Sequence, residues 1–414
     1  MQISKRRKGK KRQHVIPISK EIVIEILRRV PCQDLTENLK KVCMEWCSII
    51  YSGSFAYSQI EHRILKSSSS FSQMEAVVIT LADDQHSQVI VSSLEWHSNQ
   101  NHSFQDLKTK DLYTTKDVLV QTWLPMPRRR IMRVNPVNGF VCFWSTTDHS
   151  RFHIFNPVTK EHVTTPTNTY LGKNMNDDPS AVGLGICPLS YEYKVVVLDN
   201  TESGKIKPSI FTIGKDYLWR SLKEIPHHIL AEVQTVAYVK GVLYWYTKTC
   251  TSAHYLTTYQ IKTTKTLICF DVTKEEFDMI VVSFESLKKQ VISIAEKGGR
   301  LCLVIISYGP ICSLLIEVYV AHNINDLSSL NSWKKELTVT APSIAYNLEL
   351  EFVHIIIVTD EILVIQLDER GVGFFDVATG KLLGLYYVPF QGTAIPYVPS
   401  LVALRHRPLL ASSS

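Results

Sequence analysis

The chain lacks the features of a membrane protein and of a secreted protein held together by disulfides. Nowhere in its 414 residues does an apolar run approach the ~18 residues needed to span a bilayer. No apolar stretch follows the basic N-terminus, as it would in a signal peptide. The nine cysteines are scattered and odd in number, and none forms a C-x-x-C pair. We therefore expect reduced thiols in an intracellular protein with no membrane partner.

Motifs that carry catalysis or hold a cofactor are also absent from the sequence. There is no G-x-S-x-G, no H-E-x-x-H and no glycine-rich phosphate loop ending in Lys-Ser/Thr. Cys43 and Cys47 lie one helical turn apart with no histidine at metal-site spacing, and we expect them to be buried helix cysteines. His227 and His228 are adjacent, so on a strand they would face opposite ways, and a solvated loop is the simpler interpretation. We expect no catalytic residue, no bound metal and no cofactor.

Positive charge is concentrated at the N-terminus. The net charge is +6, and residues 1–13 hold seven lysines and arginines and no acidic residue, so the rest of the chain is near −1. The stretch KRRKGKKR has the composition of a nuclear import signal, or of a solvated tail without a role. The near-neutral body argues against nucleic acid as a partner. We expect a basic disordered tail at 1–14 and a protein of the nucleus, the cytoplasm or both.

Short amphipathic helices are predicted after the tail. In Glu21–Pro31 the apolar residues recur at helical spacing on one broad face, and the proline ends the pattern. Asp34 and Glu37 have the D-x-x-E spacing of a capping box, and the apolar side continues to Ile50. A unit of this size is marginal alone and usually needs a partner. Its surplus apolar surface indicates a docking face, unless the helices simply pack on the rest of the chain.

Beyond this helical segment the chain reads as β-structure. Runs such as EAVVITL, FVCFW, YKVVVLD, RLCLVIIS and GVGFFDV alternate with turn signals, and no long amphipathic helix interrupts them. A loose repeat joins FHIFNPVTKE, LICFDVTKEE and GVGFFDVATGK, in which a strand ends in Asn or Asp and enters a Thr-containing turn. Repeated antiparallel units of this kind favour a β-propeller or propeller-like ring. A tandem of β-sandwiches is the alternative.

The helical segment resembles the F-box. The stretch ISKEIVIEILRRVPCQDLTENLKKVCMEWCSII matches the usual spacing of apolar residues, the proline and the V-C-x-x-W phrase. It departs from it at Ser19, where the family usually has proline, and at Glu37 and Asn38, which replace the usual Arg-Phe. The resemblance implies a helix-in-groove contact with a Skp1-like adaptor. The residues that it assigns to adaptor binding, some of which must also form the core of the module, are Ile22, Val23, Ile26, Leu27, Pro31, Leu35, Val42, Cys43 and Trp46.

The β-rich remainder is similar to the plant F-box-associated domain of the type 3 kind. The phrases NGFVCFW, FNPVTKE, YEYKVVVL, VKGVLYWYT and LICFDVTKEEF occur in the order that this family shows. The implied fold is multidomain α plus β, with a small helical F-box followed by an all-β, propeller-like domain. The expected divisions are a tail at 1–14, the F-box at 15–60, a linker at 61–72, the F-box-associated domain at 73–400 and a C-terminal tail at 401–414.

The two resemblances together imply a non-catalytic function. A protein of this kind would be the substrate-receptor subunit of an SCF-type E3 ubiquitin ligase. Its F-box would hold a Skp1-like adaptor and through it a cullin, and its β-domain would recruit an unidentified protein target for ubiquitination. The alternative is a propeller that binds a ligand or catalyses a reaction behind a degenerate F-box, because propellers host both enzymes and scaffolds.

Overall fold

A computed structural model describes most of the chain. It covers residues 18–67, 75–81, 89–95, 108–115, 131–145, 148–171, 179–230, 235–251, 253, 264–282, 291–308, 313–324, 326–341, 354–359, 361–366, 371–387 and 393–404. The basic tail expected at 1–14, part of the expected linker and most of the expected C-terminal tail lie outside these ranges.

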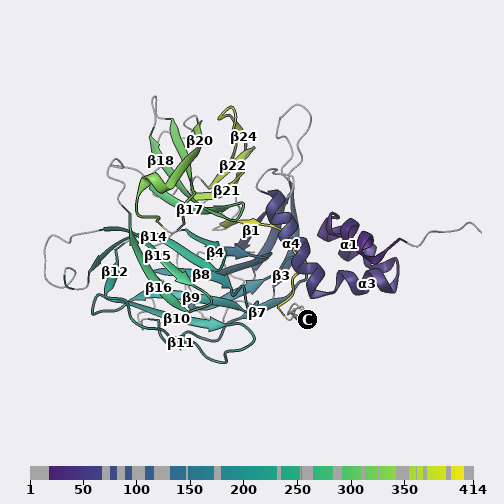
Figure 1. The fold of residues 1–414 in the computed structure, drawn as a ribbon, viewed down its shortest axis with the longest axis horizontal. Coiled ribbons are helices and arrows are strands. Elements are labelled where there is room, and N and C mark those ends of the chain that lie inside the picture. The colour runs from purple at the N-terminus through teal and green to yellow at the C-terminus, as the bar shows by residue number, and fades with distance from the viewer. Residues whose placement is uncertain are drawn as a thin grey trace, which may run out of the picture.

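The described chain opens with four α-helices that precede all the strands. They are α1 (Lys20–Arg28), α2 (Cys32–Glu37), α3 (Met44–Ile50) and α4 (Gly53–Ser67), with a 3₁₀ turn at Leu39–Lys41 between α2 and α3. In Figure 1, α1 and α3 stand outside the sheets, and α4 lies between them and the β-structure. None of the helices in the described ranges is long and apolar enough to cross a membrane.

Two helix boundaries differ from the sequence expectation. Pro31 occupies the N-cap of α2, so Asp34 and Glu37 lie inside this helix and form no capping box. A proline suits this place because it cannot continue α1 and its fixed φ is compatible with a helix start. The last helix, α4, continues to Ser67, so residues 61–67 of the linker expected at 61–72 are helical.

The described strands form six antiparallel sheets, each from consecutive stretches of sequence apart from one closing strand. The first sheet contains β1 (Glu75–Leu81), β2 (Val89–Glu95), β3 (Lys108–Thr115) and the closing strand β25 (Thr393–Tyr397). The second contains β4 (Ile131–Val137), β5 (Phe140–Ser145), β6 (Asp148–Phe155) and β7 (His162–Thr164). The third contains β8 (Ala181–Ile186), β9 (Tyr193–Asn200), β10 (Ile206–Thr212) and β11 (Arg220–Ser221).

The remaining sheets repeat the same plan. The fourth contains β12 (His227–Ile229), β13 (Val236–Val239), β14 (Val242–Thr251), β15 (Thr264–Asp271) and β16 (Glu276–Val281). The fifth contains β17 (Val291–Lys297), β18 (Arg300–Tyr308), β19 (Leu314–Ala321) and β20 (Trp333–Ala341). The sixth contains β21 (His354–Val358), β22 (Ile362–Gln366), β23 (Gly371–Asp376) and β24 (Leu382–Tyr387).

The six sheets close into a ring through one strand of each. In order around the ring, β4 contacts β8, β8 contacts β13, β13 contacts β17, β17 contacts β21, β21 contacts β25, and β25 contacts β4. The ring is completed by β25 from the end of the chain, which pairs antiparallel with β1. This arrangement confirms the propeller expected from the repeat, and it excludes the tandem sandwich.

The repeated turn has one structural cause. The side chains of Asn156, Asp271 and Asp376 each accept hydrogen bonds from backbone N–H groups two or three residues further on. This local bonding is the reason that Asn and Asp favour such turns. In each case the residue four positions later has a left-handed backbone: Lys160 (φ 63°), Glu275 (φ 59°) and Gly380 (φ 67°).

Tryptophan side chains fill the spaces within and between sheets. Trp144, Trp219, Trp245 and Trp333 are all buried. Trp245 on β14 donates from Nε1 to the carbonyl of Val182 on β8, at 3.2 Å. Trp219 donates to the carbonyl of Pro166, which follows β7, at 2.8 Å. Two of these rings therefore connect neighbouring sheets directly.

The helices share a hydrophobic core with the propeller. The Tyr57 ring on α4 packs edge-on against Tyr191 of the β8–β9 turn, with 4.9 Å between ring centroids. The Cys32 thiol on α2 has two acceptors within reach of its single S–H, Oε1 of Gln59 on α4 at 3.2 Å and the carbonyl oxygen of Pro399 at 3.4 Å. One continuous cluster of buried residues runs from Leu27 into the propeller. The helices therefore pack on the rest of the chain through one of their faces.

Two further expectations are corrected. His227 and His228 lie on β12, paired with the end of β14, and both are half-buried, so this pair does not form a solvated loop. Burial lowers the pKa of both imidazoles, because it disfavours the charged form. Residues from 401 onward were expected to be a tail, yet Leu401 and Val402 are buried. Asn156 donates to the carbonyl of Val402 at 2.7 Å, so the folded domain extends to this point.

Candidate docking surface

Helix α1 is apolar on two faces that have different surroundings. Val23 and Leu27 are four residues apart and are buried in the core shared with the propeller. Ile22 and Ile26 are also four residues apart, and about half of each side chain is exposed. Residues at this spacing lie one above the other on a helix. One face therefore fixes α1 on the protein, and the other presents isoleucines to solvent.

A second group of exposed apolar side chains surrounds the start of α3. Val42 and Met44 flank Cys43, and Met44 is 85% exposed. Cys43 is exposed at the N-cap of α3, where its sulfur accepts the N–H of Trp46 at 3.5 Å. The expectation of a buried helix cysteine is therefore wrong at this position. Tyr51, just after α3, is exposed, and its hydroxyl accepts a hydrogen bond from the ammonium of Lys40 at 3.2 Å.

The nine residues assigned to adaptor binding divide into three groups. Val23, Leu27 and Leu35 are buried, and Trp46 is half-buried against the core. The exposed members are Ile22, Ile26, Pro31, Val42 and Cys43. Sequence reasoning left Ile18, Met44 and Tyr51 out of the set, although all three are exposed and apolar. Their apolar type is the signal that could have included them, and Met44 also lies within the V-C-x-x-W phrase.

We define the apolar helical surface as Ile18, Ile22, Ile26, Val42, Met44 and Tyr51. Among the described residues, large apolar side chains are exposed at eleven positions, and these six are the majority. Some of the charged groups on α1 are paired with one another. Glu25 forms ion pairs with Arg28 and Arg29, and the hydrogen bond from Arg28 lowers the pKa of that carboxyl group. The six residues form two groups, one on and just before α1 and one around α3. Exposed apolar side chains of this kind mark interaction sites.

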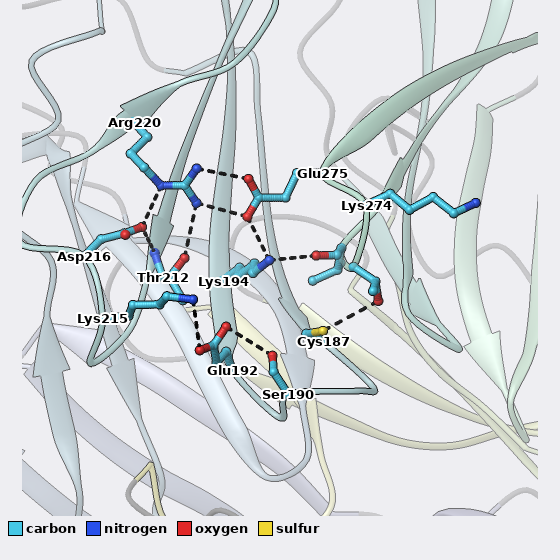
Figure 2. A network of polar contacts seen from close by, with 12 residues as sticks. Cys187, Ser190, Glu192, Lys194, Thr212, Lys215, Asp216, Arg220, Lys274 and Glu275 are labelled. Atoms are coloured by element: carbon cyan, nitrogen blue, oxygen red, sulfur yellow. Dashed lines mark hydrogen bonds and ion pairs between the residues drawn. The ribbon is translucent and has the colours of Figure 1, made fainter.

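A network of hydrogen bonds and ion pairs lies between the third and fourth sheets (Figure 2). Glu275, in the β15–β16 turn, accepts two hydrogen bonds at 3.0 Å from the guanidinium of Arg220. It also accepts one at 2.8 Å from the buried ammonium of Lys194, which donates in addition to the carbonyl of Val272. These donors lower the pKa of Glu275 to about 2, with the Arg220 hydrogen bonds as the largest cause. Paired in this way, the carboxylate joins two sheets and is poorly suited to proton transfer.

No metal centre is apparent in the part of the chain that the structure describes. Within it, no group of three or more His, Cys, Asp or Glu side chains is arranged to hold a metal ion. The polar network of Figure 2 is instead built from complementary charges that satisfy one another.

Comparison with known proteins identifies relatives of the β-domain. The family described as "F-box associated beta propeller domain" matches residues 77–378. The F-box protein At4g19940 of Arabidopsis thaliana is 25% identical over 364 residues, covering 84% of this chain and 77% of the relative. Another Arabidopsis thaliana protein named for an F-box, At3g52320, is 24% identical over 300 residues, covering 70% of this chain and 67% of the relative.

A solved structure, that of apo AztD from Citrobacter koseri, covers 78% of this chain and 98% of its own. Its sequence identity is 9% and its TM-score is 0.36, so this likeness carries no argument.

Proposed function

The chain belongs to the F-box-associated β-propeller family, and from this premise we propose that it is the substrate-receptor subunit of an SCF-type ubiquitin ligase. The helices of residues 18–67 bind a Skp1-type adaptor and through it a cullin, and the propeller recruits a protein target. The chain itself makes no bond. It raises the effective concentration of the target and orients it for ubiquitin transfer. It works in the nucleus, the cytoplasm or both, and the basic composition of residues 1–13 supports import into the nucleus.

The apolar helical surface is the observation that carries this proposal. Ile22, Ile26, Val42 and Met44 are exposed on a helical module whose other face is already packed on the propeller. Fully burying an apolar side chain of this size contributes about 1.5–3 kcal/mol. A partner that offers an apolar groove would therefore gain substantial free energy at this surface.

The buried members of the predicted set have a different role in this proposal. Val23, Leu27 and Leu35 hold α1 and α2 in place and cannot reach a partner while the module is folded. A charged substitution at Leu27 would disrupt the core and would not test contact with the adaptor. The exposed isoleucines are the informative positions.

The experiment is a binding measurement between the full chain and a recombinant Skp1-type adaptor. The full chain is used because Leu27 shares its core with propeller residues such as Phe140. We expect wild type to bind, and the double variant Ile22→Asp/Ile26→Asp to lose at least tenfold in affinity, because two apolar contacts are replaced by solvated charges. Val281→Asp, at an exposed apolar residue on β16, is the matched control and should bind like wild type.

Two results would overturn the proposal. One is a folded wild-type chain that does not bind the adaptor, and the other is undiminished binding by the double variant. Circular dichroism and a thermal melt establish that each protein is folded. The first result would favour a propeller that acts as a binder behind a degenerate F-box. The second would mean that the adaptor binds another surface of the chain and that the exposed isoleucines of α1 are not its contact.

A further inference from the structure

Exposed apolar side chains also cluster on the propeller. Outside the helical module, the described residues expose large apolar side chains at five positions, and three of them lie on two adjoining turns. Leu189 is in the β8–β9 turn, and Tyr217 and Leu218 are in the segment between β10 and β11. Tyr217 is 93% exposed. We call these three residues the apolar propeller patch.

The two turns that carry the patch are held side by side. They adjoin because Lys194 at the start of β9 pairs with Thr212 at the end of β10. An ion pair of 3.3 Å between Lys215 and Glu192 connects the turns directly. Asp216 accepts the N–H of Thr212 at 2.8 Å, which closes the second turn on itself. The patch therefore rests on a hydrogen-bonded base.

The neighbouring sheet reinforces this base. Arg220 follows the patch closely in the sequence, and its Nε donates to the carboxylate of Asp216 at 3.2 Å. Its two terminal nitrogens form the bidentate hydrogen bond with Glu275 of the fourth sheet. Figure 2 shows Lys194, Arg220 and Glu275 meeting between the turns of the two sheets. A surface fixed in this way loses little conformational freedom when a partner binds, so more of the contact energy appears as affinity.

Around the patch, the lysine side chains at the surface are more exposed than the carboxylates. The carboxylates of Glu192, Asp216 and Glu275 are largely covered and occupied by hydrogen bonds. The side chains of Lys215 and Lys274, by contrast, are 63% and 69% exposed. In Figure 2 the side chain of Lys274 extends away from the network. Lys215 pairs with Glu192, which is 16% exposed, and Lys274 lies 3.7 Å from the carboxylate of Asp271, which is 33% exposed. In both pairs the lysine is the more exposed partner, so the charge that an incoming segment meets first is positive and is complementary to acidic side chains.

We propose that the apolar propeller patch, with Lys215 and Lys274 at its rim, recognises the target through a peptide segment that carries an apolar anchor beside Asp or Glu side chains. This inference rests on the proposed function and specifies the chemistry of the target. Tyr191, two residues after Leu189, packs on Tyr57 of α4. A segment bound here is therefore held beside the helix that connects the propeller to the adaptor-binding module.

The test uses short random peptides displayed on phage and selected against the folded full chain. We expect the selected peptides to combine Asp or Glu with Leu, Phe or Trp. Synthetic versions should bind the Tyr217→Ser/Leu218→Ser variant at least tenfold more weakly, because the central anchor contacts are lost. Lys274→Glu should weaken binding about threefold, and added salt should weaken binding to wild type, because both reduce rim attraction.

Val281→Ser is the matched control, because it removes an exposed apolar side chain from another strand. It should bind the peptides like wild type. Tyr217 and Leu218 are so exposed that their replacement leaves the core untouched, and circular dichroism verifies this. The inference is overturned if no peptide is enriched, if the selected peptides show no acidic bias, or if the patch variant binds them undiminished.

The same proteins separate this inference from the proposed function. Adaptor binding and peptide binding are measured on wild type, on the patch variant and on Ile22→Asp/Ile26→Asp. If wild type binds acidic peptides through the patch but does not bind the adaptor, the recognition surface is supported and the ligase role is overturned. If it binds the adaptor but selects no such peptides, the ligase role is supported and the recognition surface is overturned.

Discussion

At the scale of single residues, the ammonium group of Lys194 is buried beside the carboxylate of Glu275. The Lys194 side chain is 7% exposed, and its counter-charge is the Glu275 carboxylate at 2.8 Å. We predict that Glu275→Gln lowers the free energy of unfolding at pH 7 by about 2 kcal/mol, because it leaves a buried charge without its partner. Urea unfolding measures this. Glu276→Gln, at the exposed neighbour, should change the stability by less than about 0.5 kcal/mol.

The same carboxylate gives a prediction with a defined pH window. Its pKa is lowered from 4.5 to about 2 in the folded protein, by hydrogen bonds from Arg220 and Lys194. Because the folded pKa is below the unfolded one, the stabilisation is complete above pH 4.5 and is lost as the pH falls toward 2. The stability gap between wild type and Glu275→Gln should therefore shrink over this range. A gap that stays constant in urea titrations from pH 6 to 3 would contradict this assignment.

Residue type could be predicted from the sequence, but residue exposure could not. Ile22 and Val23 both belong to the broad apolar face expected for α1, yet one is exposed and the other is buried. Neighbouring residues on a helix differ in direction by about 100°, so a broad stripe contains both kinds. Which part is covered depends on where the propeller packs, and contacts such as the one between Tyr57 and Tyr191 are distant in sequence.

At the scale of elements, long strands and turns were predictable because their signals are local. The stretches EAVVITL and YKVVVLD correspond to β1 and β9, and the Asn and Asp turns have the bonding that their residue types favour. The short strands β11 and β12 and the closing strand β25, which contains Pro396, carry no such signal. They are strands because their neighbours pair with them.

Helix α4 leads to a prediction about the joint between the helices and the propeller. Tyr57 is buried, and its ring contacts Tyr191 across this joint. We predict that Tyr57→Ala costs about 3 kcal/mol of stability, within the range found for large buried aromatics. Hydrogen exchange should also become faster in α4 than in β9. Tyr217→Ala, which removes an exposed ring, should change neither quantity, and equal effects of the two variants would contradict the role of this joint.

At the scale of the whole molecule, the fold depends on a strand from the end of the chain. The strand β25 pairs with β1 and contacts β4 and β21, so it completes the ring between the first and last sheets. The segment that follows packs tightly on the second sheet. Gly139, in a left-handed turn at φ 81°, approaches Ser400 so closely that an added Cβ would lie 2.3 Å from the serine Cβ.

We predict that a chain ending at Gln391 does not form a cooperative propeller, whereas a chain ending at Leu404 does. The first truncation removes β25 and the buried side chains of Ile395, Tyr397 and Val402, which leaves β1 as an open strand edge. An unpaired edge of this kind promotes association with other chains. The second truncation keeps every described contact of this closure.

Calorimetry should show one sharp transition for the longer chain and a broad or absent one for the shorter. A sharp transition in both would mean that the ring forms without its closing strand. The ring strands β4, β8, β13, β17 and β21 would then be sufficient to stabilise the fold.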